Sequence, residues 1–177
     1  DGTGVRDCTM RHSLAVQARW LARHVEWHLL GNHLFANGKA LVFCGLAFDG
    51  PEAARWLRLG SSIVIREVEE QVLPDGGHFE RSPLYHAIIM EDVLDLLNAC
   101  ATFNGPSTLV APLRSAATRM AAALRVMPQP DRGPFFFNDC AFGIAPPADA
   151  LLAYARRLDL PVGELDTPAG TSVSTPP

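Results

Sequence analysis

Side chains that can transfer protons or bind anions gather in two short stretches of this 177-residue sequence, residues 24–33 and residues 75–92. The candidates are one amide, three imidazoles and one phenol: Asn32, His33, His78, Tyr85 and His86. Imidazole and phenol groups serve as general acids and bases, and an amide can donate hydrogen bonds to an oxyanion. Because packing alone does not require this concentration, the two stretches together predict a catalytic or binding site.

The first stretch contains two histidines and an asparagine at four-residue steps. His24, His28 and Asn32 would share one face if a single helix continued past Gly31. The spacing of the two histidines suits a metal pair, but the glutamate and third ligand of a zinc protease motif are missing, so no metal site is predicted. In a purely structural alternative, Asn32 caps a new helix and His33 is an interior histidine.

The second stretch begins at Asp75 and reads DGGHFERSPLYH. Two glycines permit an unusual backbone path, and Glu80 and Arg81 follow them. Arg81 could hold an anionic group through two hydrogen bonds, or it could pair with Glu80 in a polar loop. In the structural alternative, Tyr85 packs through its ring and keeps its hydroxyl at the rim.

Composition limits the classes of protein to which the chain can belong. Apolar residues make up 48% of the sequence and charged residues 19%, which is typical of a folded chain, and the length suits one domain. The net charge is −4 and no basic block is present, which argues against a nucleic-acid binder. No apolar run is long enough to cross a membrane, and four widely spaced cysteines favour neither a disulfide framework nor a zinc site.

Helical periodicity predicts that nearly the whole chain is α-helical. Apolar residues recur at three- and four-residue steps, and turns rich in glycine and proline separate the segments. The expected helices are 13–30, 32–48, 51–72, 83–102, 107–126 and 147–158. Phe135–Phe137 is the one segment that could be extended, and residues 161–177 are expected to form a flexible tail.

Three further expectations concern a helix surface, a helix start and the way the helices pair. The helix over 51–72 should turn outward a charged face formed by Arg66, Glu67, Glu69 and Glu70. Ser82 should cap the next helix, with Pro83 at its first position. Helices of this length joined by short turns form antiparallel hairpins, so the predicted fold class is all-α.

Three strings of the sequence resemble the heparinase II/III-like family of polysaccharide lyases. They are WHLLGNHLFANGKALVFCGLAFDG, LPDGGHFERSPLYHAIIMEDVLDLLN and FFFNDCAFGIAP, and the likeness spans roughly residues 15–160. The resemblance implies that residues 1–160 form part of an incomplete (α/α) toroid of helical hairpins. In the family a β-sandwich domain follows the toroid. We expect this domain to be absent from the chain, which would leave the active site incomplete.

The resemblance also implies β-elimination at C4 of a uronic acid in an acidic polysaccharide such as heparan sulfate, heparin or alginate. A base removes the proton on C5, and an acid protonates the departing glycosidic oxygen. Negative charge then develops beside the substrate carboxylate, so hydrogen-bond donors must stabilise it. By similarity, Asn32 donates to this carboxylate, His33 is a second donor or a base, and Tyr85 is the base, the acid or both.

The remaining candidates are placed around the substrate. The predicted substrate-binding residues are Trp27, His78, Glu80, Arg81 and His86. Free tyrosine has a pKa of about 10, so Tyr85 needs nearby positive charge to act as a base, and Arg81, His78 or His86 could supply it. Trp27 could stack on a sugar or lie in the core. No metal and no cofactor are expected.

Two other functions stay open at this point. A helical carbohydrate-binding or interaction module could keep the scaffold without the chemistry, and a hydrolase could use Glu80 and Glu91 as paired carboxylates. The resemblance implies a periplasmic or secreted location, although no signal peptide is visible in this chain. The expected partner is an acidic polysaccharide, not nucleic acid or a membrane, and the sequence indicates no oligomeric state.

Overall fold

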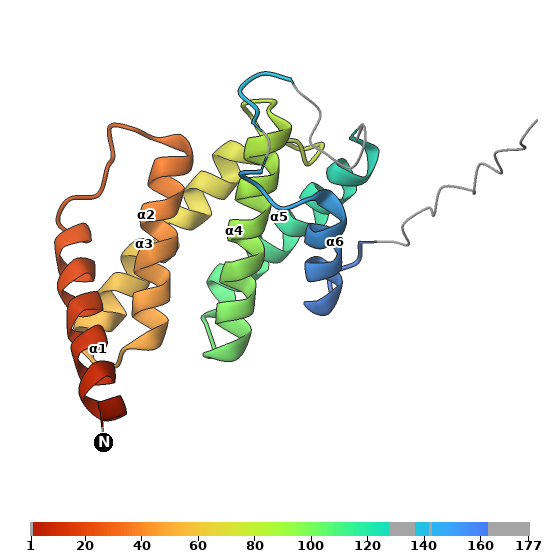
Figure 1. The fold of residues 1–177 in the computed structure, drawn as a ribbon. Helices are drawn as coiled ribbons and strands as arrows, with labels where there is room; N and C mark the ends of the chain where they lie inside the picture. The colour runs from red at the N-terminus through yellow and green to blue at the C-terminus, as the bar shows by residue number, and fades with distance from the viewer. Residues whose placement is uncertain (1, 128–136, 142, 163–177) are drawn as a thin grey trace, which may run out of the picture.

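The computed structural model describes residues 2–127, 137–141 and 143–162. Its helices are α1 (Gly2–Leu21), α2 (Gly31–Ala47), α3 (Pro51–Gln71), α4 (Pro83–Thr102), α5 (Ser107–Val126) and α6 (Ala148–Arg157). Within these residues the only β-type pairing is an isolated bridge between Val72 and His78. Figure 1 shows the helices packed side by side, with short turns between α2 and α3 and between α4 and α5. The predicted all-α fold class is confirmed.

The helices from α2 to α6 begin and end within a residue of their predicted bounds, but the first prediction is wrong. The helix expected over 13–30 ends at Leu21, and residues 22–30 form turns. The buried Asn37 side chain accepts a hydrogen bond from the Glu26 backbone N–H and donates to the Glu26 carboxylate, so it holds this connection against α2. His24 and His28 therefore do not share a helical face.

α2 and α3 form an antiparallel hairpin whose backbones approach closely. A Cβ atom added to Gly60 would lie 2.7 Å from the Gly38 carbonyl oxygen and 2.7 Å from the Val42 nitrogen. One added to Gly45 would lie 2.6 Å from the Leu57 nitrogen. Only glycine fits at such contacts, so these positions fix the close packing of α2 and α3 in their middle and towards the turn that joins them.

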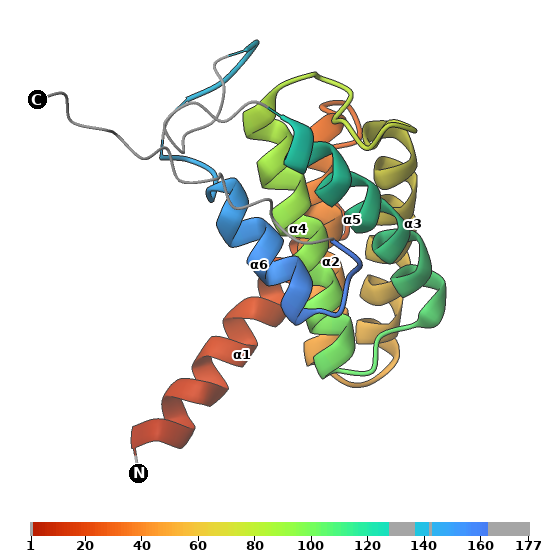
Figure 2. The same ribbon diagram turned by 90° about the vertical axis from the view of Figure 1, so that its right-hand side faces the viewer.

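The main core lies between α4 and α5, and α2, α3 and α6 add residues to it. A second, smaller cluster joins α1 to α2 and α3 through Ala18, Leu34, Leu41, Ala53, Trp56 and Ile63. α1 projects from the other helices and rests mainly on α2, as Figure 2 shows. Ala18 is its only buried apolar residue among the side chains described.

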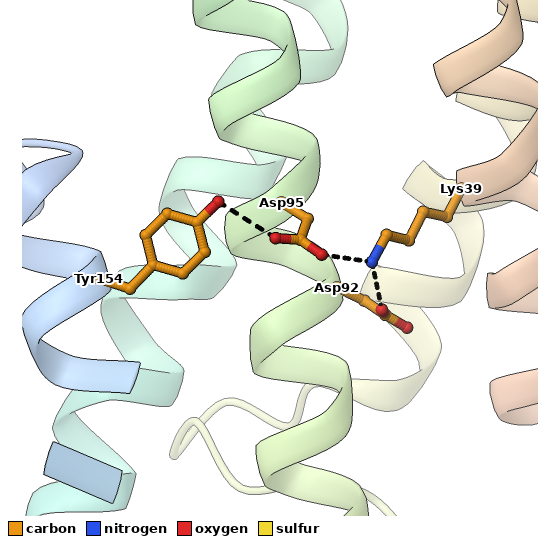
Figure 3. A network of polar contacts seen from close by, with 4 residues as sticks. All are labelled: Lys39, Asp92, Asp95 and Tyr154. Atoms are coloured by element: carbon orange, nitrogen blue, oxygen red, sulfur yellow. Dashed lines mark hydrogen bonds and ion pairs between the residues drawn. The ribbon is translucent and has the colours of Figure 1, made fainter. Parts of the chain in front are cut away.

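A half-buried polar network joins α2, α4 and α6 (Figure 3). The Nζ atom of Lys39, the only lysine of the chain, lies 2.6 Å from Asp92 Oδ1 and 2.6 Å from Asp95 Oδ2. The Tyr154 hydroxyl donates to Asp95 at 3.1 Å. Burial lowers the pKa of Lys39, but hydrogen bonds and attraction from Asp92 and Asp95 outweigh it and raise the pKa above its ordinary value. Lys39 therefore stays charged and can hold the three helices together.

The remaining expectations concern a membrane-spanning helix and two segments near the end of the chain. No helix in the described residues is long and apolar enough to span a bilayer. Phe135, Phe136 and residues 163–177 lie outside the described residues, and with them most of the extended segment and most of the flexible tail that the sequence predicts.

Candidate functional site

The two polar stretches meet at one end of the helical assembly. Figure 1 shows the beginnings of α2 and α4 at this end, together with the loop 72–82 that leads into α4. This loop passes beside the first residue of α2. A Cβ atom added to Gly31 would lie 3.8 Å from Glu80 Oε1 and 3.9 Å from the Phe79 ring.

Asn32 and His33 occupy the first turn of α2, and neither takes the structural role considered for it. The residue that caps α2 is Leu30, which has a φ of 56° and provides no side-chain hydrogen bond, so Asn32 is not the cap. His33 is exposed, so it is not an interior histidine. Asn32 is half-buried. Both side chains thus lie on the helix end that faces the loop 72–82.

Tyr85 is held at the start of α4 by the predicted cap. The Ser82 hydroxyl accepts a hydrogen bond from the Tyr85 backbone N–H at 3.3 Å and donates to the Asp139 carbonyl at 2.6 Å. The Asn138 amide donates to the carbonyl of Glu80 at 3.0 Å and to that of Arg81 at 3.2 Å. The string around Asn138 therefore fixes the loop that precedes Tyr85.

A glycine fixes the path of the same loop on its other side. Gly76 has a φ of 86°, and a Cβ atom added to it would overlap the Arg119 carbonyl oxygen of α5. No other residue type fits there without moving the loop away from α5. The Asp75 side chain closes the turn by accepting from the Gly77 N–H at 2.9 Å.

His78 lies in the interior, behind Tyr85. Its side chain is buried, and the two rings lie with centroids 6.2 Å apart and planes inclined by 26°. Its Nε2 lies 3.2 Å from the Oε1 atom of Gln71, whose Nε2 donates to Glu67 at 3.0 Å. Arg66 completes the series with an ion pair to Glu67 at 3.0 Å.

Burial changes the charge expected on two candidate residues. It lowers the pKa of His78 to about 4, with a further contribution from repulsion by His86. It also lowers the pKa of His86 to about 4, against a small opposing effect of its hydrogen bond to the Met120 carbonyl. Both rings are therefore neutral near pH 7. Of the three groups expected to supply positive charge near Tyr85, only Arg81 carries one.

His86 and Arg81 lie in opposite environments. His86 is completely buried, and its Nε2 lies 3.1 Å from the Met120 carbonyl oxygen of α5. It has no surface open to a ligand. Arg81 is exposed and has a φ of 53°. It borders a pocket of about 370 Å³ whose lining includes Leu73, His78, Met127 and Phe137 but neither Asn32 nor Tyr85.

Trp27 is exposed, so of the two alternatives considered for it the position in the core is wrong. Its exposed fraction is 47%, and the Arg66 guanidinium carbon lies 5.3 Å from the centroid of its ring. This distance is typical of a cation–π contact. Trp27 and Arg66 thus form an amphipathic surface with an apolar ring and a positive charge.

Two polar residues near the site were missed or misplaced by the sequence analysis. Glu67, expected on the charged outer face, is only 1% exposed, and Gln71 is fully buried. The buried positions of α3 are Ala53, Trp56, Gly60, Ile63, Val64, Glu67, Val68 and Gln71. Their three- and four-residue steps continue through the two polar residues, so the helical period was the signal that could have identified them.

The alternative of a hydrolase that uses Glu80 and Glu91 as paired carboxylates gains no support from the positions of these residues. Glu91 lies in α4 six residues after Tyr85, about 9 Å further along the helix. Burial raises its pKa, and its charged neighbours are Asp95, Lys39 and Asp92. It therefore belongs with the Lys39 network, whereas Glu80 lies beside Gly31.

The helices that bear Asn32, His33 and Tyr85 thus begin at the same end of the part of the chain that the structure describes. The chain belongs to the family described as Heparinase II/III N-terminus, which matches residues 8–145. The family predicted from the three sequence strings is thereby confirmed.

Curated relatives carry the name heparin-sulfate lyase. The chain is 38% identical over 69 residues to that of Bacteroides stercoris, which covers 38% of this chain and 10% of the relative. It is 27% identical over 124 residues to that of Pedobacter heparinus, which covers 70% of this chain and 18% of the relative. The chain thus spans less than a fifth of the length of these relatives. No solved structure matches the chain.

Proposed function

We propose that this protein acts in the cleavage of a uronate-containing acidic polysaccharide, of the heparan sulfate, heparin or alginate type, by β-elimination. The observation that carries the proposal is the meeting of the Asn32 and Tyr85 stretches at one end of the helices. Membership of the heparinase II/III N-terminal family and relatives named heparin-sulfate lyase support the reaction class.

In this proposal Asn32 and His33 lie beside the substrate carboxylate. The Asn32 amide donates hydrogen bonds that stabilise the charge that develops when the C5 proton leaves. The first turn of α2 adds the positive end of a helix dipole, which favours an anion at this position. His33, exposed beside Asn32, is a second donor or a base.

Tyr85 transfers the proton in this proposal, as the base, the acid or both. Deprotonation of tyrosine is favoured by nearby positive charge. Because His78 and His86 are neutral near pH 7, we assign this electrostatic role to Arg81 or to residues beyond this chain. We place Glu80, Arg81 and Trp27 along the path of the polymer, and His78 behind Tyr85.

The wider architecture is part of the same proposal. We infer that residues 1–160 contribute hairpins to an incomplete (α/α) toroid, and that residues outside this chain complete the cleft. The relatives are several times longer, which leaves room for them. An acidic polysaccharide outside the cytoplasm is the substrate that we expect, and a periplasmic or secreted location accords with it.

The ultraviolet absorbance of a 4,5-unsaturated uronate tests the proposal. The protein is incubated with heparan sulfate, heparin and alginate, and we expect the absorbance to rise with at least one of them. Tyr85→Phe should lower the rate by about 10²–10⁴-fold, because it removes positioned proton transfer. Asn32→Asp should also slow the reaction, since it replaces an amide donor with a second negative charge beside the substrate carboxylate.

Tyr154→Phe is the matched control, because it removes the hydroxyl of the other tyrosine, in α6. It should keep the native rate. Native turnover in Tyr85→Phe, or products without an unsaturated ring, would overturn the proposal. Binding of the polymers by the native protein without any rise in absorbance would favour the alternative of a helical carbohydrate-binding module.

A further inference from the structure

A buried carboxylate lies at the end of α3 next to the proposed site. Glu67 is 1% exposed on a helix face that is otherwise mostly apolar. Taking a carboxylate out of water is costly even when it is paired, and an apolar side chain of similar size would fill the position without this cost. The Arg66 guanidinium forms an ion pair with the Glu67 carboxylate at 3.0 Å.

The hydrogen bonds that begin at Glu67 have only one possible direction. A charged carboxylate can only accept, so the group of Gln71 that lies 3.0 Å from it must be the amide NH2. The Gln71 amide oxygen then faces His78 Nε2 at 3.2 Å and can only accept. His78 must therefore carry its proton on Nε2.

Gln71 also holds the backbone of the loop that carries His78. The backbone carbonyl oxygen of Gln71 accepts a hydrogen bond from the Phe79 backbone N–H at 2.9 Å. The His78 ring is thus held from both sides, by the amide side chain and by its own loop. Its face lies against Tyr85 at 6.2 Å between centroids, and no partner for its Nδ1 occurs within the described residues.

We infer that Glu67 and Gln71 are positioning residues for Tyr85. Through a one-way chain of hydrogen bonds they hold the neutral His78 ring with its proton on Nε2, and this ring supports the face of Tyr85. The role for Tyr85 rests on the proposed function, whereas the fixed tautomer of His78 does not. Neither residue touches the substrate in this arrangement.

Nitrogen-15 NMR of the histidine side chains tests whether His78 carries its proton on Nε2. Spectra of the native protein show which ring nitrogen of His78 carries the proton, and His78→Gln assigns the signal. We expect Nε2–H in the native protein and in Glu70→Gln, an exposed glutamate on the same helix. Gln71→Met, which removes the acceptor at similar volume, should give a mixture of tautomers. A native His78 with its proton on Nδ1, or with two protons near pH 7, would overturn the inference.

Steady-state kinetics test the positioning role of Glu67 and Gln71 towards Tyr85. Gln71→Met should lower kcat by about 10-fold and leave KM nearly unchanged, because a misplaced Tyr85 slows proton transfer and does not weaken binding. Glu67→Gln should lower kcat less, since the amide oxygen of the new glutamine can still accept a hydrogen bond from Gln71. If Gln71→Met does not fold, Glu67→Gln takes its place in the test. Full kcat in a variant with mixed tautomers, while Tyr85→Phe is inactive, would refute the positioning role and leave the lyase proposal intact. An active Tyr85→Phe would refute the lyase proposal without affecting the tautomer result.

Discussion

His78 and His86 differ from the other histidines at the scale of the single residue, because both rings are buried. Burial makes protonation of each ring costly, which lowers the pKa of both to about 4. His33, only one residue from Asn32, is exposed. Residue type alone would make all three equal candidates for acid–base work, and their surroundings separate them.

The lowered histidine pKa values predict how stability depends on pH. An unfolded histidine binds a proton near pH 6.5, whereas these folded ones resist protonation down to about 4. The unfolded state therefore binds more protons in this window, so the stabilisation is present above pH 6.5 and is lost as the pH falls towards 4. We expect a loss on the order of 2–3 kcal/mol per histidine. Urea unfolding between pH 4 and 7 measures it.

His86→Gln isolates one of the two contributions. Its amide can still donate to the Met120 carbonyl but does not titrate. The slope of unfolding free energy against pH should become shallower in this variant and stay unchanged in His12→Gln, which alters an exposed histidine. A slope that is equal in His86→Gln and in the native protein would show that His86 does not resist protonation.

At the scale of the element, the hairpin of α2 and α3 sets where the site lies. The loop 72–82 leaves the end of α3 and passes beside Gly31, the first residue of α2, so the antiparallel packing of these two helices brings the loop to the start of α2. The Lys39 network then ties α2 to α4, which carries Tyr85 (Figure 3). This network thus joins the two helices that bear the proposed catalytic residues.

Gly60→Ala tests the hairpin. In an exposed helix this change would stabilise by about 1 kcal/mol, because alanine is the better helix former. Here the new Cβ would lie 2.7 Å from backbone atoms of α2, which cannot rotate away. The cost of overpacking should exceed this gain, and we expect the free energy of unfolding to fall by about 2 kcal/mol or more. The shift of the urea midpoint measures it, with Ser62→Ala on the exposed face of α3 as control. A stabilised Gly60→Ala would contradict the close packing.

At the scale of the whole molecule, α1 is held more weakly than the other long helices. Ala18 is its one buried apolar residue among the side chains described, and Met10, Leu14, Val16 and Trp20 are exposed. A bidentate pair between Arg19 and Glu52 joins it to α3, but exposed pairs of this kind contribute little. The centre of the fold, from α2 to α6, contains nearly all of the core.

Amide hydrogen exchange should reveal this difference. Local opening free energies follow the buried contacts that must be broken. The amides of residues 10–21 should exchange faster than those of residues 87–97 in α4, whose face is buried among the other helices. Mass spectrometry of peptides from the two segments compares them under native conditions. Equal protection would mean that α1 opens only together with the whole fold.

The sequence by itself determined the features that depend on near neighbours along the chain. Pro51, Pro83 and the Ser82 cap mark helix starts, and helical periodicity defined the extents of α2 to α6. The strings around Asn32 and Tyr85 identified the family, because such motifs are read directly from residue order.

Only the tertiary structure decided the burial, charge and partners of the side chains. Glu67 is buried because the end of α3 packs inward, and Trp27 is exposed because the chain leaves the helix before it. His78 is neutral because residues distant in sequence exclude water from it. These properties arise from non-local contacts and solvent exclusion, which local periodicity does not encode. The sequence therefore named most candidates for the site, and the fold determined which of them lie at the surface and which support the others from behind.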